Sequence, residues 1–373
     1  MIRTPGRRFR RSALALVTVS ALALAACGGD DDTATTTEAA TPDTTAAAPA
    51  TTAGSETTDA PATTAGATET TAASGDTADG GEFKIALVAP SAVNDLAFTQ
   101  SMYDSLGRVD GISVDVSDGL FVVEDAGAAI RGYAEDGYDL VIAHGTQFGG
   151  PLEEIAPDFP DVSFMWGTST DFKGMDNIYA YSVRSDEGGY VNGTIAAQIS
   201  AAGNIGVVGP VEAGDAKLYV DGFKAGVTAT APDATVNVNW TESFSDVALA
   251  AEAATSLIAN GADVLTGTAQ LVVGATGVAQ QDGVPWFGTQ SNQTPLGEDI
   301  VVASQVYHWE VILEPIIEQI KAGTLGGEVF ELTLANDGLV MEFNDGYPLD
   351  AAIKSAAEDT IAGLTSGDLT TGL

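Results

Sequence analysis

The sequence predicts an α/β protein built from two doubly wound, Rossmann-like lobes. About 290 residues follow a long low-complexity segment, and this is enough chain for two lobes with separate cores. Ten short apolar runs in this part are typical of buried parallel strands, and stretches with helical spacing of apolar residues separate most of them. Alternation of strands and helices favours doubly wound sheets with right-handed crossovers. One sheet rarely needs ten strands, so we expect two.

The predicted strands share a short apolar core and a flanking turn residue. They are KIALVAP (84–90), ISVDVS (112–117), DLVIAHG (139–145), VSFMWG (162–167), IYAYSV (178–183), NIGVVGP (204–210), TVNVNW (235–240), DVLTGT (263–268), VPWFGT (284–289) and IVVASQV (300–306). Between them, residues such as Val220, Phe223 and Val227 recur at helical spacing and are expected to face the core.

Residues 1–26 are predicted to be a lipoprotein signal peptide. Five arginines precede an uncharged run from Ser12 to Ala26, a pattern typical of an export signal and too short for a membrane span. The run ends in Leu24-Ala25-Ala26-Cys27, which is similar to a bacterial lipobox, so we expect lipidation of Cys27. Cys27 is the only cysteine, which rules out a disulfide within one chain. The expected location is the extracytoplasmic face of the cell membrane.

Residues 27–82 are predicted to be a Thr/Ala-rich disordered tether. From Gly28 to Gly81 there is no aromatic and no basic residue, so the segment cannot bury enough apolar surface to fold. The threonines could carry sugars, although a plain solvated spacer is the simpler interpretation. Such a tether would hold a folded body at a distance from the membrane.

The charge and the scarcity of reactive side chains exclude several classes of function. The chain has 14 basic and 52 acidic residues, and five of the basic ones lie in the leader, so we expect no nucleic acid partner. Only two histidines are present, and no serine lies in a GxSxG elbow. HExxH, CxxC, GxxxxGK[ST] and GxGxxG are also absent. The sequence therefore predicts neither catalysis, nor a metal, nor a cofactor.

Ligands in open α/β sheets bind beyond the carboxyl ends of the strands. This rule predicts a site between the two lobes, formed by seven segments: Pro90 to Phe98, His144 to Phe148, Trp166 to Thr168, Pro210 to Gly214, Thr268 to Gln270, Thr289 to Gln293 and Tyr307 to Trp309.

Several segments follow one another in a characteristic order over nearly the whole of this region. They include VNDLAFTQSMYDSL (93–106), YDLVIAHGTQF and APDFPDVSF within 138–164, SVRSDEGGYVNGTIAA (182–197) and IAGLTSGDL (361–369). In this order they resemble the basic membrane protein family of lipoproteins, whose best understood members are PnrA-type purine nucleoside receptors. The most specific piece is 182–197, which is similar to the family's RxEEGxYLAG segment.

The resemblance implies a type I periplasmic-binding-protein fold, with two lobes joined by hinge crossovers. One lobe would comprise 83–183 plus about 290–325, and the other 184–289 plus about 326–373. It further implies a monomer without catalytic activity that delivers a purine nucleoside or related compound to an ABC transporter permease. Two alternatives stay open: a surface lipoprotein that senses a ligand for a membrane signalling receptor, and a binder of a sugar or other non-purine solute.

The sequence departs from the family pattern at polar positions of the expected site. Ala89 stands where the PnrA type has an acid that binds ribose hydroxyls, and Gln290 and Asn292 replace two acids of a GVDSDQ stretch. A basic residue common after the next strand is replaced around Tyr307-His308-Trp309. Such changes alter hydrogen-bond selectivity more than shape. A purine base or another heteroaromatic compound is therefore an alternative to a nucleoside.

The first helix carries two candidate ligand contacts. Phe98 matches the family aromatic that stacks on the base, which is favourable for a planar ligand. Asn94 is expected to contact the ligand, while Asp95 is equally compatible with a helix cap.

The remaining candidates follow later strands. His144 and Gln147 could bond the ligand, although a buried structural role suits His144 almost as well. Gln270, Gln290 and Asn292 are amides that can donate to and accept from base edges. A second face of an aromatic clamp is expected from Trp309, with Trp166 and Phe148 as alternatives, while Arg184 is expected to hold the segment between the lobes.

Overall fold

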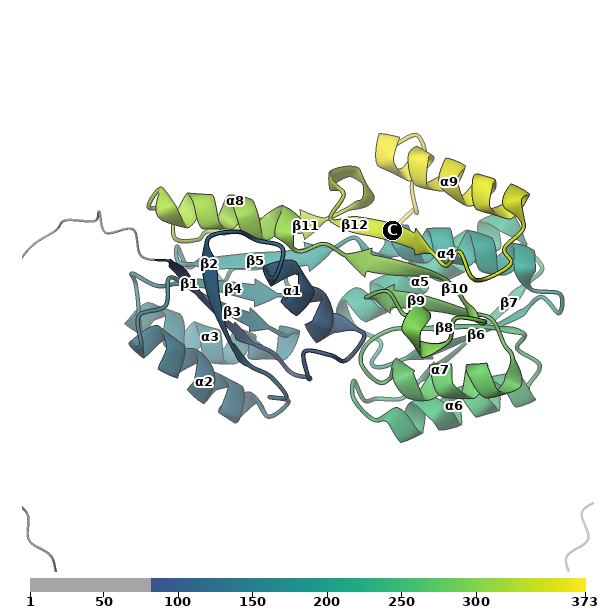
Figure 1. The fold of residues 1–373 in the computed structure, drawn as a ribbon, viewed down its shortest axis with the longest axis horizontal. Coiled ribbons are helices and arrows are strands. Elements are labelled where there is room, and N and C mark those ends of the chain that lie inside the picture. The colour runs from purple at the N-terminus through teal and green to yellow at the C-terminus, as the bar shows by residue number, and fades with distance from the viewer. Residues whose placement is uncertain (1–81) are drawn as a thin grey trace, which may run out of the picture. The chain divides into compact units, whose positions relative to one another are not determined.

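The computed structural model describes residues 82–373 (Figure 1). The predicted signal peptide, the lipidation site at Cys27 and the tether up to residue 81 lie outside the described residues. Within 82–373, the strands form two sheets of six strands each. The predicted α/β class with two parallel-dominated sheets is therefore confirmed.

The first lobe is built on a parallel sheet in the order β11-β5-β4-β3-β1-β2. Its strands are β1 (Phe83–Val88), β2 (Ile112–Ser117), β3 (Leu140–His144), β4 (Ser163–Gly167), β5 (Ile178–Val183) and β11 (Glu328–Leu332). One face carries α2 (Val123–Glu135) and α3 (Gly149–Ile155), and the other carries α1 (Phe98–Leu106) and α8 (Glu310–Lys321) (Figure 1). Two 3-10 turns, Thr146–Phe148 and Ala156–Asp158, flank α3.

The second lobe has the sheet order β12-β10-β9-β8-β6-β7, in which β12 alone runs antiparallel to its neighbour. Its strands are β6 (Asn204–Gly209), β7 (Thr235–Trp240), β8 (Val264–Gly267), β9 (Trp286–Gln290), β10 (Val301–Tyr307) and β12 (Leu339–Phe343). Its helices are α4 (Ser185–Ile199), α5 (Gly214–Thr230), α6 (Val247–Ala259), α7 (Val272–Asp282) and α9 (Ala351–Ser366), with 3-10 turns at Thr294–Leu296 and Leu334–Asn336. Figure 1 shows α6 and α7 together on one side of this sheet.

All ten predicted strands are present, although two differ in burial and two further strands were not predicted. β2 and β7 lie at sheet edges and are partly exposed, not buried, because each has a neighbouring strand on one side only. β11 and β12 are also edge strands. Acidic residues such as Glu328, Glu331 and Glu342 interrupt their apolar character, so neither gives the continuous apolar run of a buried strand.

The strand pairing differs from the lobe boundaries expected from the sequence. Residues 301–307, expected in the first lobe, pair with β9 and belong to the second sheet. Residues 328–332, expected in the second lobe, pair with β5 in the first sheet. The physical reason is that the short connection after β9 keeps the chain in the same lobe, so that the crossover comes only after β10.

Three crossovers join the lobes: Arg184, His308 with Trp309, and Thr333 to Gly338. Backbone hydrogen bonds link them, from the Arg184 N–H to the Leu332 carbonyl at 2.9 Å and from the His308 N–H to the Gly338 carbonyl at 2.8 Å. One hydrophobic cluster runs from α1 and α8 through this region to α4 and α5. The lobes therefore share a core beside the hinge and have separate cores farther away.

Close packing of α4 on α5 depends on four glycines. Gly189 and Gly193 on α4 face Gly222 and Gly226 on α5, and a Cβ atom added at any of them would overlap backbone of the other helix. The spacing of four residues places each pair on one face of its helix. The two helices therefore pack backbone to backbone.

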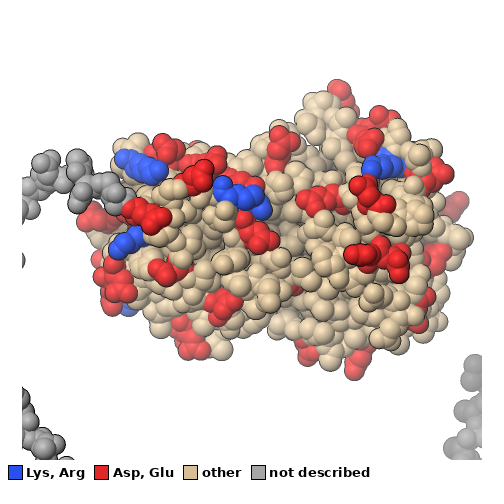
Figure 2. All heavy atoms as spheres, viewed as in Figure 1, with Lys and Arg blue, Asp and Glu red and all other residues tan. Residues whose placement is uncertain are grey.

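Acidic side chains are scattered over the face seen in Figure 2, where basic ones are few. This agrees with the large acidic excess of the sequence. Within residues 82–373, no helix combines the length and the apolar character needed to cross a membrane.

Candidate ligand-binding site

A cavity of about 310 Å³ lies between the lobes at the carboxyl ends of the strands. This is the position predicted from the strand-end rule. The first lobe lines it with Pro90, Phe98, Phe121, Gly145, Thr146, Gln147 and Thr168, and the second with Val211, Ala213, Gly214, Asp215, Ala216, Phe244, Ala269, Gln270 and Gln290.

Phe98 lines the cavity and lies on an aromatic platform. Its ring stacks on His144, with the ring centroids 3.8 Å apart and an interplanar angle of 9°. Trp309 meets the rings of both Phe98 and His144 edge-on. Because these neighbours hold the Phe98 ring from behind, it can stack on a ligand without first losing much side-chain freedom.

His144 supports Phe98 and does not itself line the cavity. It is fully buried, and its Nε2 lies 3.0 Å from the Phe98 carbonyl oxygen while its Nδ1 lies 2.6 Å from the Tyr181 hydroxyl. A carbonyl only accepts, so Nε2 carries the proton and Nδ1 accepts from Tyr181. Burial lowers the pKa of His144 to about 3, so the ring is neutral at physiological pH. Of the two roles predicted for His144, the geometry matches the structural one.

The aromatic residues expected to oppose Phe98 are packed elsewhere. Trp309 and Phe148 are fully buried, and the Trp309 indole donates to Ser101 at 2.8 Å. Trp166 packs against Gly149 and donates to the Thr146 carbonyl at 3.2 Å. In the described part of the chain, none of these three side chains lines the cavity. Two other aromatics, Phe121 at 38% exposure and Phe244 at 44%, line it instead.

Three of the predicted amides line the cavity: Gln147, Gln270 and Gln290. The Oε1 atoms of Gln270 and Gln290 are buried without a hydrogen-bond partner in the described part of the chain. An unpaired buried acceptor costs about 1 to 3 kcal/mol, which a ligand donor would recover. The backbone of Gln290 also has a φ of 71°, in the left-handed region that disfavours a residue with a Cβ. Strain of this kind often occurs at functional sites.

The polar candidates Asn94 and Asn292 lie outside the cavity lining. Asn94 is exposed, and Asn292 donates to the Glu342 carboxylate at 2.6 Å, which occupies its amide group. Asp95 accepts from backbone N–H groups at the start of α1, including that of Ala97 at 2.8 Å, and is therefore a helix cap. Burial raises the pKa of its carboxyl.

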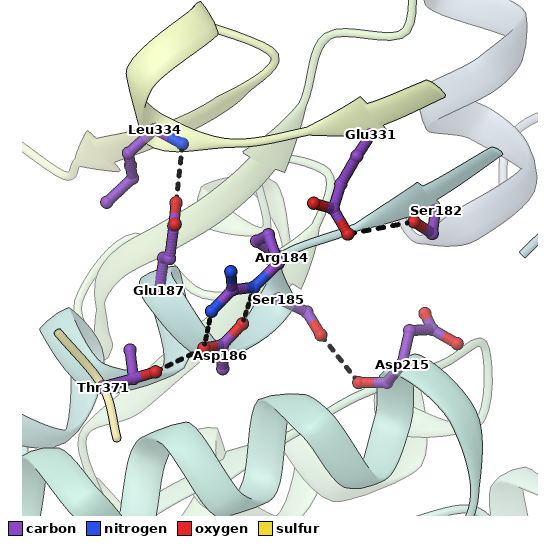
Figure 3. A network of polar contacts seen from close by, with 9 residues as sticks. All are labelled: Ser182, Arg184, Ser185, Asp186, Glu187, Asp215, Glu331, Leu334 and Thr371. Carbon is purple, nitrogen blue, oxygen red and sulfur yellow. Dashed lines mark hydrogen bonds and ion pairs between the residues drawn. The ribbon is translucent and has the colours of Figure 1, made fainter. Parts of the chain in front are cut away.

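Asp215 is the one charged side chain among the described residues that line the cavity. Its Oδ1 accepts a hydrogen bond from the Thr168 hydroxyl of the first lobe at 3.1 Å. Its backbone carbonyl accepts from the hydroxyl of Ser185, in the first turn of α4, at 2.8 Å (Figure 3). Burial raises the pKa of the Asp215 carboxyl. Asp215 thus belongs to one lobe and contacts the other.

Arg184 lies in the hinge, as expected. Its guanidinium forms two hydrogen bonds with the carboxylate of Asp186, at 2.9 and 2.8 Å (Figure 3). Thr371 donates to the same buried carboxylate, and the Glu187 carboxylate accepts from the Leu334 N–H at 2.8 Å. These contacts hold the first crossover, the third crossover and the C-terminal segment together.

Phe121, Phe244 and Asp215 were not singled out from the sequence. Phe121 follows β2 and Phe244 follows β7, the second strand of each lobe, and the strand-end rule applied to those two edge strands would have included both loops. Asp215 lies in the first turn of α5, where an acid is common for electrostatic reasons alone. Residues 82–373 contain no group of three His, Cys, Asp or Glu side chains suited to a metal ion.

A family model described as ABC transporter substrate-binding protein, PnrA-like, matches residues 83–359. The chain belongs to this Bmp family. As a Bmp-family protein it is a non-enzymatic binding protein that takes up a small solute for an ABC transporter. The resemblance found in the segment order is therefore confirmed, while the identity of the solute is a separate question.

The Bmp-family chain is similar to proteins whose names describe different roles. It is 30% identical over 245 residues to a purine-binding protein of Brucella abortus, covering 66% of this chain and 69% of that one. It is 27% identical to the transcriptional activator protein Med of Bacillus subtilis, covering 65% and 77%. A solute-binding protein of Conexibacter woesei has a similar structure, with a TM-score of 0.66, 26% identity, and coverage of 77% and 97%.

Proposed function

We propose that this Bmp-family protein captures a purine nucleoside or purine-like compound outside the membrane and delivers it to an ABC importer. The observation that carries the proposal is a cavity with an aromatic ring from each lobe, Phe98 and Phe244, and two amides with unpartnered buried oxygens. Stacked rings favour a planar ligand, and amides recognise base edges. The likeness to a purine-binding relative supports the same class of ligand.

The charge of the cavity favours a ligand without phosphate. Asp215 lines it, whereas Lys, Arg and His are absent from its lining in the described part of the chain. A phosphate entering this space would lose its hydration without gaining a cation in return. Nucleosides and bases therefore fit better than nucleotides.

The proposal includes a lipid anchor on Cys27. A receptor tethered to the outer face of the membrane stays close to its permease, and residues 27–82 would supply the spacer. Labelling of growing cells with a radioactive fatty acid should mark the wild-type chain and leave Cys27→Ser unlabelled. Equal labelling of both chains would refute lipidation at Cys27.

The ligand class can be tested with the chain from residue 27 carrying Cys27→Ser. Nucleosides, bases, sugars and amino acids are screened by thermal unfolding, because a ligand that binds the folded state raises its apparent stability. We expect stabilisation by purine compounds. Stabilisation by sugars or amino acids alone would refute the purine assignment.

A sensing role is the second candidate, favoured by the likeness to a transcriptional activator protein. Deletion of the gene separates the two roles. Loss of purine uptake without a change in gene expression supports transport, and the reverse supports sensing.

A further inference from the structure

Asp215 combines properties that the surrounding cavity residues lack. It lies in the first turn of α5, belongs to the second lobe, and lines the cavity as its one charged residue within the described part of the chain. The residue is only partly exposed, and its carboxylate bonds to Thr168 of the opposite lobe.

A second observation at the same wall points independently to a ligand. Gln290 is 3% exposed and lines the cavity, and its Oε1 has no hydrogen-bond partner among the described residues. Gln270 shows the same unpaired oxygen. Native proteins rarely leave buried acceptors unsatisfied, so a donor from outside the chain is expected here. The second lobe therefore presents three acceptor side chains to one space.

We propose that Asp215 is a specificity-determining residue that accepts a hydrogen bond from a donor group of the ligand, either a sugar hydroxyl or a ring N–H. This inference rests on the proposed purine-binding function. A carboxylate has room for about four hydrogen bonds, and the hydrogen bond from the Thr168 hydroxyl leaves capacity for a donor from the ligand.

The position of Asp215 also links ligand recognition to the approach of the lobes. Thr168 reaches the carboxylate only when the first lobe is close, and Ser185 ties the Asp215 backbone to the hinge (Figure 3). A ligand held by Asp215 is therefore held at the point where both lobes meet.

The test compares Asp215→Asn and Asp215→Ser with the matched control Glu212→Gln. Glu212 is an exposed acid three residues earlier, outside the cavity lining. Affinities for inosine, 2′,3′-dideoxyinosine and hypoxanthine are measured by calorimetry, after thermal unfolding has shown that each variant is folded. We expect both Asp215 variants to bind inosine about tenfold or more weakly, the usual effect of losing a hydrogen bond to a charged group, and the control to bind as wild type does.

The three probes identify the donor. If wild type prefers inosine to dideoxyinosine and Asp215→Asn loses that preference, the donor is a sugar hydroxyl. If hypoxanthine is weakened as much as inosine, the donor is a ring N–H. Wild-type affinity of both Asp215 variants for every probe would overturn the inference and leave the purine function intact. Failure of wild type to bind any of the three would overturn the purine function and this inference with it.

Discussion

The ring of His144 lies parallel to the ring of Phe98, and its Nε2–H donates to the carbonyl of the same residue. One neutral side chain thus fixes both the ring and the backbone of the residue expected to stack on the ligand. The sequence left both a direct ligand contact and a buried structural role open for His144, and its place beneath Phe98 matches a positioning residue.

Phe98→Ala should weaken purine binding by about 1 to 3 kcal/mol, because the stacking surface is lost. Tyr103→Ala is a matched control, since Tyr103 is an exposed aromatic on the same helix outside the cavity. Calorimetry measures both affinities. Equal effects of the two substitutions would contradict a specific role for Phe98.

His144 should make folding stability depend on pH below about 6.5. Its pKa is about 3 in the folded chain and near 6.5 when unfolded, so between these values the unfolded chain gains a proton that the folded chain cannot take up. This contribution is therefore fully present above pH 6.5. It is lost progressively as the pH falls, at up to about 1.4 kcal/mol per pH unit.

Urea unfolding of wild type and His144→Gln between pH 7 and pH 4 measures this effect. The variant should be less stable at pH 7 but lose less stability on acidification. His308→Gln is the control, because His308 is the other histidine of the chain and is partly exposed. Parallel pH profiles of wild type and His144→Gln would contradict the prediction.

Gln290→Gly should weaken purine binding without lowering the free energy of unfolding. Glycine relieves the left-handed strain at a φ of 71° and removes an unsatisfied buried oxygen, so the free energy of unfolding should rise or stay constant. Purine affinity should fall by about 1 kcal/mol or more because the amide is missing. Thermal unfolding measures the effect on stability, and calorimetry measures the effect on purine affinity. Unchanged affinity would exclude Gln290 from the binding site.

Gly226→Ala should destabilise the protein by about 1 to 3 kcal/mol, because the new methyl group would overlap the Tyr190 carbonyl on α4. Gly277→Ala provides the opposite case on α7. There a Cβ meets open space, so alanine should stabilise by about 0.5 to 1 kcal/mol through helix propensity. Denaturant unfolding of both variants measures the difference, and destabilisation of similar size would refute the close-packing account.

The fold could be predicted from the sequence because buried parallel strands leave continuous apolar runs such as DLVIAHG. Acidic residues interrupt that signal in β11 and β12, which is why both strands were missed and why residues 328–332 were assigned to the wrong lobe. The location of the cavity follows from strand ends, and so does the placement of Phe98, Gln147, Gln270 and Gln290 at its wall.

The burial of individual aromatics could not be predicted in the same way. Trp309 follows β10 and was expected to face the ligand, but it packs under α1, a contact between segments some two hundred residues apart. Phe121 and Phe244 lie in loops after edge strands, where sequence periodicity carries no information about which way a side chain points. Exposure at a cavity wall is thus a property of tertiary packing.

β11 comes late in the chain yet completes the sheet of the first lobe beside β5. A ribosome that has finished residues 83–183 has therefore produced five of the six strands of this sheet, and the β5 edge stays unpaired until Leu332 has been translated. In the second lobe, the β10 edge likewise stays unpaired until β12 has been translated. A chain that stops before Glu328 would leave β5 and β10 without their partner strands, and unpaired strands of this kind are a known route to aggregation. Neither lobe corresponds to a continuous stretch of gene, so recombination cannot exchange one lobe as a single cassette.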